Sequence, residues 1–230
     1  MELSTKKIAA LGAEFLGTGL LTLAIISIKT SGVGYSFFVA LGAGLAYAVL
    51  TFVLGANSGA HLNPALTIGL WTTRKIKSAK AVLYVVLQLL GGWAAYGVYV
   101  YLVKTHLQNT GGAFSTRVMV AEGLGTLVFV FGWAAAAAQK YEGLLWGVTV
   151  GASLALGILV AAIASNGLIN PALAIGTHAW DVFGSSGWGN YVLGPVVGGV
   201  VGVNLYNYVF SPAAGKMSMK TKTSSAKKKK

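Results

Sequence analysis

The tripeptide Asn-Pro-Ala occurs at residues 63–65 and again at residues 170–172, each time followed by Leu-x-Ile-Gly. Asn is a strong N-cap, and Pro suits the first helical position because its φ is fixed and it has no amide hydrogen. Each stretch therefore predicts a helix start, yet both interrupt some of the most apolar sequence in the chain. Polar backbone at membrane depth is tolerated only where it is buried in protein or lines a water-filled path.

Groups suited to catalysis are scarce. The chain has no Cys, three His and five Asp or Glu residues. Without Cys there is no disulfide framework, thiolate metal site or Cys nucleophile. The sequence shows no nucleophile–base pair, phosphate loop or metal cluster, so an enzyme is the least favoured class. We expect no catalytic residue, no metal and no cofactor.

The composition predicts an all-α membrane protein. Of the 230 residues, 55% are hydrophobic and 10% are charged, and the mean hydropathy is +0.71. The first apolar run is as long as a membrane helix requires and longer than the apolar region of a signal peptide, so we expect no cleavable signal. Six membrane-length segments are predicted, roughly at 8–28, 36–56, 79–103, 117–138, 144–165 and 188–210.

The basic residues indicate topology rather than nucleic-acid binding. The net charge is +12, but the Lys and Arg residues gather in connections between spans and in a Lys-rich tail over 211–230. With an even number of spans and both termini in the cytoplasm, fourteen of the seventeen lie inside, and only Lys29, Lys104 and Arg117 lie outside. We expect a multi-pass protein of the cell membrane, whose tail is disordered and rests on anionic lipid.

The two halves of the membrane domain, 1–210, repeat each other. Ala-Glu-x-x-Gly-Thr opens the first span at Ala13 and the fourth at Ala121, an offset close to that between the Asn-Pro-Ala motifs. Each half, about 8–105 and 115–210, has three spans, so the halves must be inverted relative to each other. Inverted repeats place a shared site near the midplane, built from interrupted helices.

On these motifs the chain resembles the major intrinsic protein family, the aquaporins and aquaglyceroporins. The resemblance implies six tilted helices plus two re-entrant half-helices, one pore per subunit and a homotetramer. The expected function is a passive channel for water and small uncharged solutes in the lipid bilayer, with no nucleic-acid partner. The expected pore residues are those of the two motifs, namely Asn63, Pro64, Ala65, Asn170, Pro171 and Ala172.

Elementary electrostatics supports this expectation. The N-terminus of a helix carries roughly half a positive charge, so two half-helices facing across one pore form a barrier to cations and hydronium. The amides of Asn63 and Asn170 can each donate a hydrogen bond to a passing water. A water that accepts both has its hydrogens turned away, which interrupts a chain of proton transfer.

Three further residues acquire structural roles by resemblance. Glu14 and Glu122 are costly in a bilayer and must face protein or a cavity. The family implies that they anchor backbone groups of the two re-entrant loops. His61, two residues before Asn63, is expected to contribute mainly its backbone carbonyl.

The sequence departs from the family at the outer constriction, where Leu173 replaces the usual Arg. The other three filter positions fall on Ala43, Ile158 and Gly167. These residues predict a wider constriction that admits glycerol, urea, ammonia or hydrogen peroxide as well as water. The competing outcome is an apolar ring that dewets and closes. A separate hypothesis concerns His178, five residues after Leu173: when protonated, it partly replaces the positive charge of the missing Arg.

Two other function classes stay open at this point. A secondary transporter also uses inverted repeats and broken helices, but it needs a coupling-ion site. A non-conducting adhesion or scaffold protein could use the same fold, since fold alone does not determine function.

Overall fold

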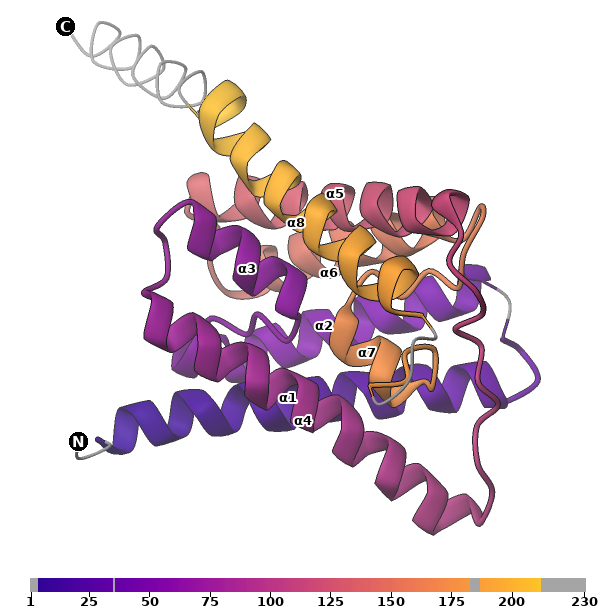
Figure 1. Cartoon of the computed structure of the whole chain (residues 1–230). Coiled ribbons are helices and arrows are strands. Elements are labelled where there is room, and N and C mark those ends of the chain that lie inside the picture. Colours follow the sequence, from indigo (N-terminus) through magenta and orange to yellow (C-terminus); the bar gives the residue numbers. More distant parts are fainter. Residues whose placement is uncertain (1–3, 35, 183–186, 212–230) are drawn as a thin grey trace, which may run out of the picture.

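The computed structural model describes residues 4–34, 36–182 and 187–211, and these ranges are almost entirely helical (Figure 1). The helices are α1 (Thr5–Thr30), α2 (Ser36–Ser58), α3 (Pro64–Thr72), α4 (Ser78–Val103), α5 (Thr116–Ala138), α6 (Gly143–Ala161), α7 (Pro171–Gly176) and α8 (Gly194–Leu205). Two short π-helical segments, η1 (Gly189–Leu193) and η2 (Tyr206–Phe210), extend α8 at its two ends.

Six of these elements are long and apolar enough to cross a membrane, and they lie where the sequence predicts them. The largest difference is in α6, which ends at Ala161 rather than near residue 165. Beyond that end, the Ser165 hydroxyl lies 2.7 Å from both the Ala161 carbonyl and the Glu122 carboxylate of α5, either of which it can donate to. The last span is continuous only if η1 and η2 are counted with α8. Of the predicted tail, residues 212–230 lie outside the described residues.

The two halves of the chain interleave. Helices α1, α2 and α4 pack together, as do α5, α6 and α8, and α2 packs against α6 where the halves meet. The short helix α3 of the first half packs against α8 of the second, while α7 packs against α4 of the first. In Figure 1 the two short helices extend in opposite directions from the centre of the bundle. The fold is therefore the predicted all-α bundle with two half-helices in an inverted arrangement.

Close packing of the half-helices depends on glycine. A Cβ atom on Gly92 of α4 would lie closer than 3.0 Å to the carbonyl of Ala172, and one on Gly199 of α8 equally close to that of Ala65. These two contacts occupy corresponding positions of the repeat. In membranes, small residues allow backbones to approach closely and so drive helix association. Each motif alanine is thus seated on a glycine of the opposite half.

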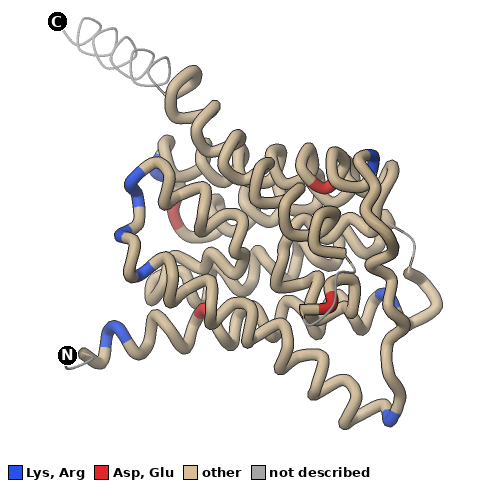
Figure 2. Tube along the Cα trace, in the orientation of Figure 1, with Lys and Arg blue, Asp and Glu red and all other residues tan. Residues whose placement is uncertain are grey.

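The surface matches a membrane environment. Apolar side chains cover the sides of the bundle; Leu45, Phe52, Leu102, Leu144 and Ile163 are each at least 65% exposed. Charged residues lie mainly at the two ends (Figure 2). The start of α1, the α3–α4 connection with the first turn of α4, and the end of α5 hold seven of the ten Lys and Arg residues within the described ranges.

The seating of α7 on α4 can be tested with two glycines of one helix. Gly92→Ala should destabilise the protein by about 1–3 kcal/mol, because its Cβ meets the Ala172 backbone, which cannot give way. Gly97→Ala should be neutral or stabilising, because nothing lies within 4 Å of a Cβ there. Thermal unfolding of both variants in detergent measures the difference. Equal melting temperatures would show that the packing has been misassigned.

Candidate functional site

Each half-helix begins as the sequence predicts, with Asn as the N-cap and Pro at the first position. The Asn63 Oδ1 atom accepts from the Ala65 N–H at 2.8 Å, and the Asn170 Oδ1 atom accepts from the Ala172 N–H at 3.0 Å. Both Asn residues have nearly identical extended backbone angles. The side-chain oxygen of each Asn therefore accepts a hydrogen bond from its own helix.

The nitrogen atoms of the same amides join the two halves of the chain. Asn63 Nδ2 donates to the Ile169 carbonyl at 3.0 Å, and Asn170 Nδ2 donates to the Leu62 carbonyl at 2.8 Å. These reciprocal hydrogen bonds bring the N-termini of α3 and α7 together inside the bundle. Because a primary amide has two N–H donors, each Asn keeps one hydrogen for another partner. Sequence reasoning identified the donors but not these bonds across the repeat.

The loops that lead into the half-helices are held in an unusual backbone conformation. Ala60 and Leu62 have φ values of 46° and 48°, and the corresponding residues of the second half, Gly167 and Ile169, have values of 63° and 45°. A non-glycine residue in this left-handed region costs about 1–2 kcal/mol. Such conformations persist only where the surroundings over-determine them.

Glu14 holds the first loop. Its buried carboxylate accepts from the backbone N–H groups of His61 and Leu62 at 3.0 and 2.8 Å. A third donor is the side-chain amide of Gln88 in α4, at 2.7 Å. Gln88 also donates to Thr67 of α3, so one buried network joins α1, the loop, α3 and α4. Nothing in the motif pattern pointed to Gln88, whose position is set only when α4 packs against α1.

Glu122 holds the second loop with a different third partner. Its carboxylate accepts from the N–H groups of Leu168 and Ile169, and from the Ser165 hydroxyl at 2.7 Å. The Ser165 oxygen in turn accepts from the N–H of Gly167 at 3.0 Å. Both carboxylates are thus fully engaged by the protein, the arrangement that lets a buried charge persist in an apolar environment.

His61 lies in the first re-entrant loop, with its side chain among aromatic rings. Its Nδ1 atom is 3.1 Å from the Thr67 hydroxyl, and its ring meets Tyr84 and Trp133 edge-on, with centroid distances of 5.3 and 5.9 Å. The Tyr47 hydroxyl donates to the His61 carbonyl at 3.3 Å. Within the described ranges, no group of three His, Cys, Asp or Glu residues could hold a metal ion.

The four positions that the resemblance assigns to an outer filter lie on α2, α6, α7 and the second re-entrant loop. Ala43 of α2, Ile158 of α6 and Leu173 of α7 belong to one apolar cluster, and all are buried. A Cβ on Gly167 would lie 3.0 Å from the Ile158 carbonyl, so the second loop passes directly beside α6. The four contribute no side-chain hydrogen-bonding group, which leaves backbone carbonyls as the polar atoms at this level.

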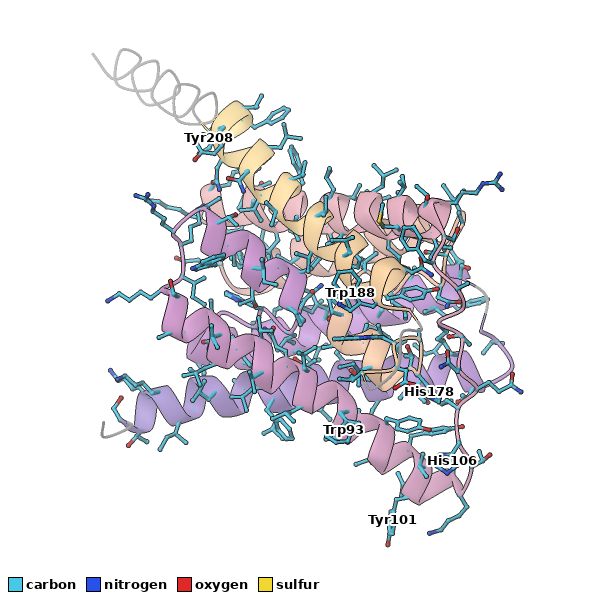
Figure 3. The ribbon with its side chains drawn as sticks, in the orientation of Figure 1. Trp93, Tyr101, His106, His178, Trp188 and Tyr208 are labelled. Atoms are coloured by element: carbon cyan, nitrogen blue, oxygen red, sulfur yellow. The ribbon has the colours of Figure 1, made fainter. Side chains whose placement is uncertain are left out.

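His178 is placed away from these positions. Its Nδ1 atom lies 2.8 Å from the Leu107 carbonyl, and its ring lies against Tyr96 with centroids 5.4 Å apart. Figure 3 shows it beside the connection that carries His106, with Trp93 on the neighbouring α4. These contacts place His178 on the α4 side of the bundle, whereas Ala43 and Ile158 come from α2 and α6. The geometry gives no support to His178 as the substitute filter cation.

Comparison with known proteins agrees with this geometry. The family model described as major intrinsic protein matches residues 2–206. Aquaporin AqpM from Methanothermobacter marburgensis is 32% identical, with 86% of this chain and 96% of that protein covered. Aquaporin NIP1-1 from Zea mays is also 32% identical, over 91% of this chain and 77% of that protein. The aquaglyceroporin structure from Plasmodium falciparum has a TM-score of 0.68 and 24% identity, covering 90% of this chain and 98% of that one.

The hold of Glu122 on its loop is open to direct test. Glu122→Gln keeps the shape of the side chain but replaces one carboxylate oxygen by an NH2 group. That NH2 group then faces a donor from which the carboxylate accepted a hydrogen bond. We expect a loss of about 1–3 kcal/mol, the cost of leaving a buried donor unsatisfied, measured as a lower unfolding temperature. Glu142→Gln is the control, since Glu142 precedes α6 without a side-chain cap. An unchanged unfolding temperature for Glu122→Gln would contradict the anchoring role.

Proposed function

The chain belongs to the major intrinsic protein family, whose members are channels rather than enzymes, and we propose that it is a passive pore for water and small uncharged solutes. The main support is the meeting of two helix N-termini, where Asn63 and Asn170 each keep one amide hydrogen that is not bonded to any of the residues that the structure describes. These hydrogens supply two donors to a permeating oxygen atom. The facing helix dipoles repel cations and hydronium at the same level.

The selectivity that we propose follows from the outer filter. Ala43, Ile158, Gly167 and Leu173 replace the polar and aromatic groups that narrow this level in other family members. A filter of this kind discriminates by size and offers a solute mainly backbone carbonyls. The proposed solutes are therefore glycerol, urea, ammonia or hydrogen peroxide, together with water.

The proposed arrangement in the membrane rests on charge and on family resemblance. Both termini are assigned to the cytoplasm, because the end of the bundle where α1 begins carries most of the Lys and Arg residues (Figure 2). A homotetramer with one pore in each subunit is proposed from the family alone.

Purified protein in liposomes tests the function. Stopped-flow light scattering should show water and glycerol fluxes faster than those of protein-free liposomes, without any ion gradient. Fluxes equal to those of empty liposomes would overturn the channel proposal and favour a non-conducting scaffold or a closed, dewetted filter. Flux that requires an imposed ion gradient would instead favour a secondary transporter.

The filter assignment predicts the effect of restoring the missing cation. Leu173→Arg should lower glycerol and urea flux by about tenfold or more, because in the proposed filter the longer, charged side chain would occupy the path of the larger solutes. Water flux should fall less, since water is the smallest solute. Leu173→Met, which roughly conserves volume, serves as the control. Unchanged glycerol flux in Leu173→Arg would show that residue 173 does not line the pore.

A further inference from the structure

A small hollow of about 120 Å³ lies between the ends of α1, α2 and α6 and the second re-entrant loop. Unlike the other hollows described at the surface, its lining is more polar than apolar. Its position is at the end of the bundle opposite the basic end, where α1 ends and α2 begins (Figure 1). Its lining includes Lys29, Val39, Ile158, Ala162, Ser165 and Asn166.

The hollow lies directly outside the proposed filter. Val39 is one helical turn from Ala43 along α2, and Ala162 follows the end of α6 one turn beyond Ile158. Ile158 itself lines the hollow, and the last lining residue along the chain directly precedes Gly167. Of the four filter positions, Ile158 lines this space, Gly167 is the next residue after a lining residue, and Ala43 lies one helical turn from another. In the proposed pore, this hollow is therefore the space on the outer side of the filter.

Lys29 is the one Lys or Arg residue among those that line this hollow. It lies in the last turn of α1, where the helix dipole favours a cation, and its side chain is partly buried. Ser165 lines the same hollow and donates to the Glu122 carboxylate, so the hollow lies beside the network that anchors the second loop. Lys29 is therefore next to the loop that carries Gly167.

We propose that Lys29 supplies the outer cation that Leu173 does not, and so is a specificity-determining residue of the pore. This proposal rests on the proposed channel function. Its ammonium donates a hydrogen bond to the hydroxyl or carbonyl oxygen of an entering neutral solute and repels inorganic and organic cations. The ammonium group of lysine is a compact charge on a flexible side chain, whereas the guanidinium group of arginine is planar and rigid. Lys29 therefore maintains an electrostatic barrier without narrowing the filter.

The test compares two lysines at the same end of the bundle. Lys29→Met and Lys104→Met remove the same charge, but Lys104 lies at the end of α4 with its ammonium over the Tyr101 ring, 4.5 Å from the centroid. Glycerol flux is measured by light scattering in liposomes, and methylammonium entry is measured as ion current through protein reconstituted in planar bilayers. A charged cleft changes local ion concentration by about tenfold or more, so Lys29→Met should admit methylammonium at least about tenfold faster than wild type. Lys104→Met should not.

Two further variants separate a charge effect from misfolding. Lys29→Arg should retain cation exclusion, and Leu173→Arg in the Lys29→Met background should restore it. Wild-type protein that conducts no glycerol would overturn the channel function itself. Wild-type protein that conducts glycerol, with methylammonium entry equal in Lys29→Met and Lys104→Met, would overturn the role of Lys29 alone. If Lys29→Met no longer conducts glycerol, Lys29→Arg decides the question. A Lys29→Arg protein that conducts glycerol but also admits methylammonium would overturn the role of Lys29 as well.

Discussion

The backbone N–H groups of two loops must find partners in the middle of a membrane, and the rest of the structure depends on how they do so. Where a loop faces the protein and the lipid rather than the proposed pore, no water is available to accept these bonds, and each unsatisfied group would cost several kcal/mol, roughly the transfer cost of a bare amide. Two buried carboxylates meet the requirement, each accepting from two consecutive N–H groups. The charges of Glu14 and Glu122 are tolerable for the same reason, because the loops surround them with donors.

The same bonds explain why neither half of the repeat forms the site alone. The loop of one half presents its carbonyl to the Asn of the other, and each half-helix is seated on a glycine of the opposite half. A left-handed residue such as Leu62 is strained in isolation but is fixed here from both sides. The strain becomes useful because it directs loop carbonyls and amide donors toward a common centre. Interleaving is therefore the condition for preorganised polar groups at this depth.

Much of this arrangement could be predicted from the sequence, because it depends on local chemistry and on a repeat. Apolar runs fixed the spans to within a few residues, and Asn-Pro fixed the starts of α3 and α7. Gln88 could not be found in this way, since a lone polar residue in an apolar run gives no partner until α4 meets α1. Lys29 was counted only as an outside charge. The hypothesis that His178 replaces the filter cation stays a prediction without structural support, because distance along the chain from Leu173 does not tell which neighbours a side chain contacts.

An outer filter without polar side chains, as we propose for this pore, changes the kind of discrimination that is physically available. A site built to hydrogen-bond its solute rejects an analogue that lacks the group by about 10⁴-fold or more, because buried donors are then left unpaired. An apolar site distinguishes neighbours that differ by one methylene by only about 10–200-fold. In the proposed filter, Ala43, Ile158 and Leu173 would therefore sort solutes by size without recognising any one of them. Recognition through hydrogen bonds would then fall to the amides of Asn63 and Asn170, which are buried where the two half-helices meet.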